Sequence, residues 1–222
     1  MILAIDTATR FISLALHDGK RLLLESTWLT ANNHSVELPP AIRAAFAQAR
    51  LAPSSLQAVA VAQGPGSFTG LRIGLGVAKG IAVAQNIPLI AVPTLQIVAA
   101  AAPLGTHPLV AVLQAGRGRL CAQTFHSQNG EWKAVDSARI TTWAELFTTI
   151  SADTLVAGEV DDQAHAALAA SQTPVHLVPP AVGLRRAGYL AEIAWARLTE
   201  GHTDDPRTVT PIYLHQPGVA HP

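Results

Sequence analysis

The sequence predicts an α/β protein made of two similar lobes, and three observations lead to this prediction. Short apolar runs typical of buried strands alternate with longer helical patterns. The resulting order, βββαβαβα, occurs twice along the chain. The chain has 222 residues and 49% of them are hydrophobic, which is enough for a sizeable core. We therefore expect two mixed sheets, each with helices packed on it.

The first copy of the pattern begins with three strands. ILAIDTA and FISLAL precede RLLLEST, and Asp18-Gly19 between the last two is a strong β-hairpin signal. Pro39 and Pro40 suit the start of the first helix. The remaining elements are predicted as a helix over 38–50, a strand over 56–63, a helix over 69–86, a strand over 87–92 and a helix over 94–102.

The second copy follows the same order and ends in a helix. Thr142 and Glu145 fit a capping box at its first helix, and Gly201 closes its last helix. We expect an N-terminal lobe over 1–103 and a C-terminal lobe over 104–222, with the last helix and a frayed tail at 215–222 packing back on the first lobe. The predicted strands are 108–114, 119–125, 131–140, 154–158 and 175–179, and the predicted helices are 142–150, 161–170 and 188–201.

Composition excludes several classes of protein. Lys and Arg total 15 and Asp and Glu total 15, so there is no basic excess of the kind that grips nucleic acid. Only 14% of the residues are charged, which indicates a surface partly covered by a partner. Cys121 is the only cysteine and cannot form an internal disulfide or a cysteine-based zinc site. The N-terminus reads as a strand and no apolar run is long enough for a membrane span, so we expect a cytoplasmic protein.

The segment GPGSFTG at 64–70 has the composition of a phosphate-binding loop but not its ending. A P-loop enters its helix with Gly-Lys-Ser/Thr. Here Gly70 is followed by Leu71 and Arg72, and Lys79 comes more than two turns later. The segment is therefore predicted to be a tight turn before a helix.

Glycines continue inside that helix. Gly76, Gly80 and Ala84 share one face, and Gly70 with Gly74 forms a second pair. An interior glycine costs a helix about 1 kcal/mol relative to alanine unless close packing offsets it. Such a face admits another backbone, either that of the neighbouring sheet or that of a partner's helix. Spacing alone favours the sheet.

The duplicated order resembles the actin/hexokinase/Hsp70 ATPase superfamily, with its ribonuclease H-like fold. GPGSFTGLRIGLGVAKG is similar to the signature of the TsaB (YeaZ) family, and ILAIDTAT, NIPLIAVPTL, AGRGRL and PIYL extend the likeness along the chain. The resemblance implies a noncatalytic subunit that binds and activates a TsaD-like enzyme. That enzyme transfers a threonylcarbamoyl group to N6 of adenosine 37 in tRNAs that read ANN codons.

The same resemblance implies a set of partners. A TsaE-like ATPase joins the complex, a threonylcarbamoyl-adenylate synthase supplies the substrate, and tRNA is met through the complex. Without its partner the chain is expected to form a homodimer through the same helices. The partner interface is carried over to Leu38, Ile42, Phe46, Gly70, Leu71, Arg72, Gly74, Gly76, Lys79 and Gly80.

Nucleotide and metal sites are predicted to be degraded. Asp6, Thr7 and Thr9 lie where the superfamily has a phosphate hairpin, so they are assigned as vestigial nucleotide-binding residues, with Asp6 capping its own turn. The matching position in the second lobe is Gln114, which lacks the charge that holds Mg²⁺, and Gly158 stands alone where paired glycines are usual. We expect no cofactor on this chain alone, with ATP and Mg²⁺ used by the assembled complex.

The sequence predicts neither a metal site nor a catalytic site. His34 has Leu38 four residues later in place of a second histidine, so no metal site is predicted. No catalytic residue is assigned, because Cys121 lies inside a strand and Ser67 lacks the spacing of a nucleophile elbow. The alternative function is an ATP-binding small-molecule kinase or ATPase of the same superfamily, and a peptidase is the least favoured.

Overall fold

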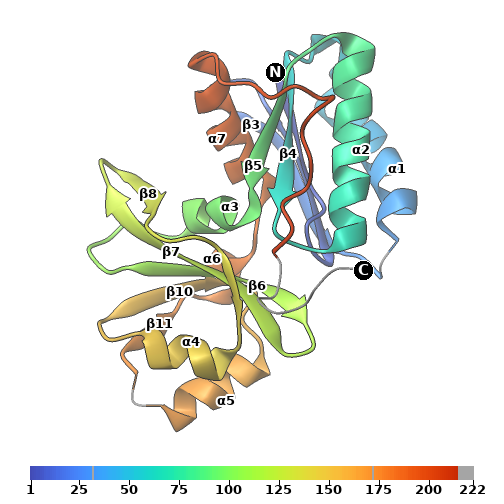
Figure 1. The fold of residues 1–222 in the computed structure, drawn as a ribbon. Helices are drawn as coiled ribbons and strands as arrows, with labels where there is room; N and C mark the ends of the chain where they lie inside the picture. Colours follow the sequence, from blue (N-terminus) through green and yellow to red (C-terminus); the bar gives the residue numbers. More distant parts are fainter. Residues whose placement is uncertain (32, 172, 215–222) are drawn as a thin grey trace. The chain divides into compact units, whose positions relative to one another are not determined.

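The computed structural model describes residues 1–31, 33–171 and 173–214 (Figure 1). The chain forms two compact units. The first contains Met1–Ile97 together with Arg186–Ile212, and the second contains Val98–Arg185 with Tyr213 and Leu214. The last helix thus belongs to the first unit, while the tail predicted at 215–222 lies outside the described residues. Among the described residues, no helix has the length and hydropathy needed to cross a membrane.

The first unit is built on a five-stranded mixed sheet with the order β3-β2-β1-β4-β5. β2 pairs antiparallel with β1 and β3, whereas β4 runs parallel to β1 and β5. Every residue of β1 is buried, as expected for a strand with helices on both faces of its sheet. The strands are β1 (Ile2–Asp6), β2 (Phe11–His17), β3 (Leu22–Leu29), β4 (Ala58–Gly64) and β5 (Leu89–Pro93).

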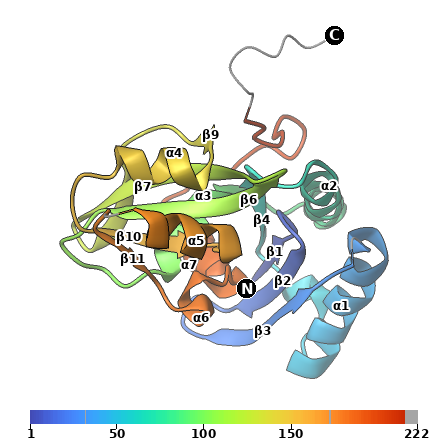
Figure 2. The same cartoon turned by 90° about the horizontal axis from the view of Figure 1, so that it is seen from below.

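Helices cover both faces of this sheet. α1 (His34–Ala49) and α2 (Phe68–Gln85) lie on one side, and α7 (Ala187–Thr199) lies on the other (Figures 1 and 2). Glu25 of β3 fixes the start of α7, because its carboxylate accepts from the Gly188 amide at 2.7 Å and pairs with Arg186. η1 (Pro53–Ser55) precedes β4, and α3 (Thr94–Ala101) follows β5.

The second unit has a six-stranded sheet with the order β11-β10-β6-β7-β8, and β9 also pairs with β7. Its core lies between this sheet and α4 (Trp143–Thr149), and includes Val110, Val112 and Phe147. The other elements are β6 (Leu109–Gly116), β7 (Arg119–Gln128), β8 (Glu131–Ala134), β9 (Arg139–Thr141), β10 (Thr154–Gly158), α5 (Asp162–Ala170), β11 (Val175–Leu177) and α6 (Pro180–Gly183).

The predicted order is confirmed in the first unit, and one strand prediction in the second is wrong. The run 131–140 is not a single strand, because it divides into β8 and β9. Asp136 causes the break. Its carboxylate accepts from the Thr124 amide at 2.7 Å and the Thr124 hydroxyl at 2.8 Å, taking the place of a ladder partner. The capping box of Thr142 and Glu145 is confirmed.

The start of α1 also differs from the prediction. The helix begins at His34, so Pro39 and Pro40 lie inside it and not at its first turn. The early start is fixed by side chains that the proline signal does not reveal. Glu37 accepts hydrogen bonds from Trp28 Nε1 at 2.7 Å and Thr30 Oγ1 at 2.8 Å, which ties the first turn to the end of β3.

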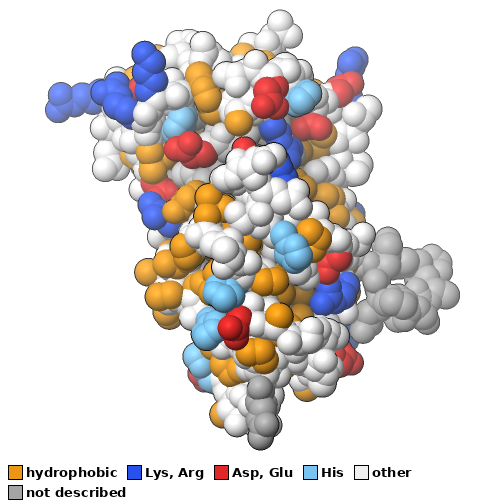
Figure 3. Space-filling model, turned by 90° about the vertical axis from the view of Figure 1, so that its left-hand side faces the viewer, with side chains coloured by type: hydrophobic (Ala, Val, Ile, Leu, Met, Phe, Trp, Pro, Cys, Tyr) orange, Lys and Arg blue, Asp and Glu red, His pale blue; other side chains and the backbone are white. Residues whose placement is uncertain are grey.

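Neither sign of charge dominates the face of the molecule in Figure 3. Charged side chains of both signs lie among hydrophobic ones on the face in Figure 3, in keeping with the equal totals of acidic and basic residues.

Candidate functional site: the α1–α2 layer and the loop beneath it

The GPGSFTG segment forms the tight turn that the sequence predicts. Ser67 caps α2, because its hydroxyl accepts from the Gly70 amide at 3.2 Å. The Ser67 amide in turn donates to the carbonyl of Ala8 at 2.6 Å. The segment therefore joins the start of α2 to the loop between β1 and β2, and its hydrogen bonds go to the chain itself.

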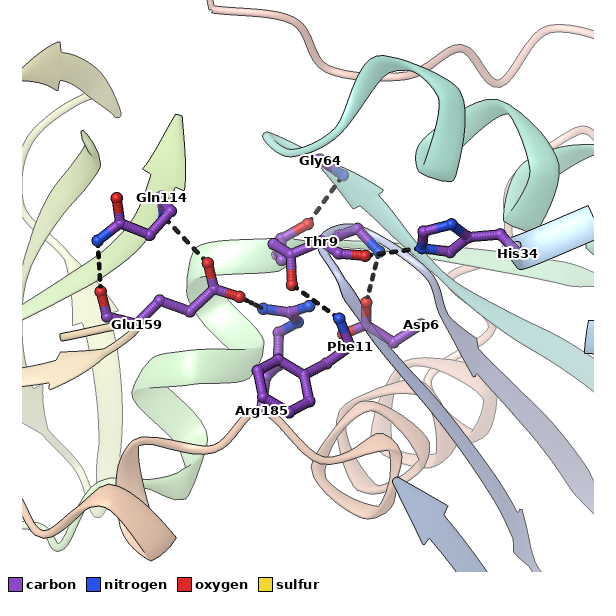
Figure 4. A network of polar contacts seen from close by, with 10 residues as sticks. Asp6, Thr9, Phe11, His34, Gly64, Gln114, Glu159 and Arg185 are labelled. Atoms are coloured by element: carbon purple, nitrogen blue, oxygen red, sulfur yellow. Dashed lines mark hydrogen bonds and ion pairs between the residues drawn. The ribbon is translucent and has the colours of Figure 1, made fainter. Parts of the chain in front are cut away.

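The β1–β2 loop contains the three residues assigned as vestigial nucleotide-binding residues. The Asp6 carboxylate accepts from the Ala8 amide at 2.9 Å, which confirms that it caps its own turn. Thr7 Oγ1 donates to the Gly70 carbonyl at 2.7 Å. The Thr9 carbonyl accepts from His34 Nε2 at 2.7 Å (Figure 4). All three side chains are buried. These bonds hold the loop against the starts of α1 and α2, and nucleotide contact stays a prediction.

Glycines of the turn and helix press directly on this loop. A Cβ added at Gly70 would lie 2.2 Å from the Thr7 carbonyl oxygen, and one at Gly74 would lie 2.2 Å from Thr7 Oγ1. A Cβ at Gly66 would meet the Ala8 carbonyl oxygen at the same distance. The pair Gly70 and Gly74 thus serves close packing inside the first unit.

The other two glycines of α2, Gly76 and Gly80, have open space beside them. A Cβ added at Gly76 or Gly80 has no described heavy atom within 4 Å, outside the helix's own backbone. Both residues are exposed. Spacing alone favoured the neighbouring sheet as the contact of these glycines, and for Gly76 and Gly80 that prediction is wrong, because both lie on the side of α2 away from the sheet.

The residues predicted for the partner interface fall into two groups. Leu38, Ile42, Phe46 and Leu71 are buried in the hydrophobic core of the first unit, and Gly70 and Gly74 pack on the β1–β2 loop. Arg72, Gly76 and Gly80 are exposed, and Lys79 is half-buried. A partner on this layer would touch the second group, while the first group supports the helices from below.

Residues of the two helices that face away from the sheet, most of them exposed and Lys79 half-buried, form a surface that we call the outer helix surface. Val36 is 71% exposed and Val83 is 65% exposed, and Phe68 lies under the Arg72 guanidinium with 3.9 Å to the ring centroid. Sequence reasoning missed these three apolar residues, although Val83 lies three residues after Gly80 and so shares the helix face of Gly76 and Gly80. The surface comprises Val36, Pro39, Pro40, Arg43, Ala44, Ala47, Phe68, Thr69, Arg72, Gly76, Lys79, Gly80, Val83 and Ala84.

In the second unit, Gln114 belongs to a local polar cluster. Its amide side chain donates to Asp161 Oδ2 at 2.9 Å. Its backbone amide donates to Glu159 Oε2 at 3.0 Å (Figure 4). Glu159 also pairs with Arg185, with 3.4 Å between Oε1 and Nη1. Gly158 has φ +123°, and a Cβ there would lie 2.0 Å from the Val112 carbonyl oxygen. Position 114 thus fastens the end of β6 to the loop after β10.

The remaining candidates are a metal site at His34 and a nucleophile at Cys121. Across residues 1–31, 33–171 and 173–214 there is no group of three or more side chains arranged to hold a metal ion. Glu37, the carboxylate three residues after His34, is bonded to Trp28 and Thr30. Burial and the charge of Glu159 raise the pKa of the Cys121 thiol to about 11, so it is protonated at neutral pH and unsuited to nucleophilic attack.

Comparison with known proteins decides the family. Residues 28–218 match the family model described as TsaD, tRNA N6-adenosine threonylcarbamoyltransferase. The chain belongs to this family. Two similar curated proteins bear the name tRNA threonylcarbamoyladenosine biosynthesis protein TsaB. One from Haemophilus influenzae is 29% identical over 96% of this chain and 92% of its own length. One from Bacillus subtilis is 32% identical over 66% of this chain and 65% of its own length.

A solved structure extends the likeness to the fold. YeaZ from Pseudomonas aeruginosa superposes with a TM-score of 0.82 at 29% identity, covering 96% of this chain and 99% of that one. The ethanolamine utilization protein EutJ from Carboxydothermus hydrogenoformans shares the fold alone, at 13% identity and a TM-score of 0.51. The resemblance to the TsaB (YeaZ) family and the predicted α/β fold with two mixed sheets are confirmed.

Proposed function

We propose that this chain is a noncatalytic subunit that binds and activates a TsaD-like enzyme through the outer helix surface. The enzyme would transfer a threonylcarbamoyl group to N6 of adenosine 37 in tRNAs that read ANN codons. A TsaE-like ATPase and a threonylcarbamoyl-adenylate synthase would act with it in the cytoplasm, and tRNA would be met through the complex. ATP and Mg²⁺ would serve the complex, with no cofactor held by this chain alone.

The open glycine face of α2 is the observation that carries the proposal. Two interior glycines cost the helix about 2 kcal/mol relative to alanine, and no contact of the described chain compensates for Gly76 or Gly80. A helix from another protein could approach this backbone closely. Val36 and Val83 on either helix would then lose their contact with water, which favours association.

The contacts of the β1–β2 loop support the noncatalytic part of the proposal. Asp6 and Thr7 each bond to their own chain, as is typical of a loop that positions two helices. Gln114 is neutral and bonded to Asp161 and Glu159. Magnesium sites on proteins are built from carboxylates, so this arrangement favours an accessory role. ATP·Mg²⁺ binding that depends on Asp6 would favour the kinase alternative instead.

The first test enlarges a glycine of the open face. Gly80→Leu should abolish capture of the organism's TsaD-like protein in a pull-down and remove this chain's effect in a reconstituted tRNA modification assay. Gly105→Leu is the matched control, because Gly105 also has open space around its Cα and lies outside α1 and α2. It should behave as wild type.

The substitution separates binding from folding. Leucine is a better helix former than glycine by about 0.8 kcal/mol, so Gly80→Leu should unfold at a higher urea concentration than wild type. Wild-type capture by Gly80→Leu would contradict the assigned surface. A homodimer in the absence of the partner is a further prediction, and light scattering that shows only monomer at high concentration would oppose it.

A further inference from the structure

Two histidines that are distant in the sequence meet at one edge of the second unit. His107 lies two residues before β6, and His176 is the middle residue of β11. Their ring centroids are 6.4 Å apart, and the ring planes are inclined to each other by 54°. Both residues are exposed. Sequence spacing does not indicate this pair, because β6 to β10 lie between the two positions.

The sheet of the second unit places His176 at this edge. β10 lies between β6 and β11, and Leu155 of β10 pairs with His176. Val175 and Leu177 pack against the hydrophobic core of the unit. Because side chains alternate along a strand, His176 therefore turns to the other face of the sheet. Asp153 comes directly before β10 and completes the group.

The carboxylate of Asp153 favours one form of the His176 ring. Its Oδ1 lies 3.8 Å from His176 Nε2, which favours the neutral form with the proton on Nε2. The lone pair of that form is on Nδ1. Metal-binding histidines commonly have a carboxylate beside the ring nitrogen that does not hold the metal. Asp153 is thus placed to orient His176 and not to act as a third ligand.

We propose that His107 and His176 together bind one divalent transition-metal ion of the class of Zn²⁺, each through one ring nitrogen, with water completing the coordination. Imidazole suits Zn²⁺, Ni²⁺ and Cu²⁺, whereas Mg²⁺ and Ca²⁺ prefer oxygen ligands. The ion would tie the edge strand β11 to the segment before β6. It would have a structural role and would take no part in the transfer reaction of the proposed function.

The separation of the two rings fits this assignment after a small movement. A zinc–nitrogen bond of about 2.0–2.1 Å puts each ring centroid about 3.2 Å from the ion, so two centroids can be at most about 6.4 Å apart. Tetrahedral coordination brings them about 1 Å closer. Both side chains are exposed, so a change of side-chain torsion supplies this movement without repacking the core.

Zinc titration of the full chain tests the proposal. Calorimetry with ZnCl₂ should show saturable binding, and His107→Ala and His176→Ala should each weaken it by about a hundredfold. Mg²⁺ at the same concentration should not compete. The urea concentration at the unfolding midpoint should rise with added Zn²⁺ for wild type, because an ion that binds only the folded state stabilises it. It should rise much less for either variant.

The role of Asp153 has its own test. Asp153→Asn removes the charge and should weaken zinc binding by about tenfold, whereas Asp153→Glu keeps the charge and should recover most of the affinity. Nitrogen NMR of the His176 ring should show the form protonated on Nε2 in wild type and a mixture of both neutral forms in Asp153→Asn. An unchanged ring in Asp153→Asn would contradict the orienting role.

His202→Ala is the matched control. His202 also lies beside a carboxylate, with 3.2 Å between its Nδ1 and Glu200 Oε2, but it belongs to the first unit. This variant should bind zinc as wild type does. Equal zinc binding by wild type, His107→Ala and His176→Ala would show adventitious binding only and would overturn the inference, as would no binding by wild type. Either result would leave the proposed function standing, since that function requires no metal on this chain.

Discussion

Gly74 and Gly76 are two residues apart in α2, and their surroundings are opposite. A side chain at Gly74 would strike Thr7 Oγ1 at 2.2 Å, whereas one at Gly76 would meet nothing within 4 Å. Two residues turn a helix by about 200°, so the two glycines lie on opposite faces. The inner face is glycine because the chain's own loop lies against it. No part of the described chain lies against the outer face in the same way. Close contact with a partner would explain why glycine stands there.

The largest expected effect comes from filling the inner face. Gly70→Ala would bring a methyl group against the Thr7 carbonyl oxygen, which is backbone and cannot rotate away. Overpacking of this kind costs about 1–3 kcal/mol, and we expect the upper end of that range. Urea denaturation of the purified chain would measure the loss. Unchanged stability would mean that the loop and α2 are less tightly packed than described.

Gly74→Ala should be destabilising by a smaller amount, and it should be rescued by a second substitution. The obstacle is the Thr7 hydroxyl, which also donates to the Gly70 carbonyl. Thr7→Ala removes that obstacle, so the double variant should be more stable than the sum of the single effects predicts, by about 1 kcal/mol. The same Thr7→Ala change should not rescue Gly70→Ala, because a backbone oxygen remains in place.

Substitutions that fill the outer face should stabilise the chain. Gly76→Ala and Gly80→Ala should each raise the free energy of unfolding by about 1 kcal/mol, since alanine is the better helix former and space is open around both residues. Urea midpoints measured on the chain without its partner would test this. A loss of stability would show that these glycines serve the chain's own fold, and the contrast between the two faces would disappear.

The smallest expected effect concerns pH and the anchoring of α1. Hydrogen bonds from Trp28 and Thr30 lower the pKa of Glu37 below its ordinary value of 4.5. A carboxyl with a depressed pKa stabilises the folded state above its ordinary pKa, and this contribution is lost as pH falls through the lowered value. The stability difference between wild type and Glu37→Gln should therefore shrink below about pH 4.5. A difference that stays constant from pH 7 to pH 3 would refute the anchoring role.

The sequence predicted the fold well. It did not predict which residues of the candidate site are buried and which are exposed. Alternating apolar runs and turn residues gave the element order of the first unit, because burial and turn geometry are encoded locally. The split between β8 and β9 was missed, since it depends on Asp136 bonding to Thr124 across the sheet. The early start of α1 was missed for the same kind of reason, because Glu37 meets partners on β3.

The sequence by itself determined that GPGSFTG is a turn and no P-loop, that α2 carries two pairs of glycines, and that position 114 lacks a charge. Only the tertiary structure decided which pair of glycines faces the chain itself and which is open. Helical periodicity fixes that Gly74 and Gly76 point in opposite directions. It cannot fix which direction is inward, because that depends on where the β1–β2 loop comes to lie, and Thr7 is distant from both glycines in the sequence.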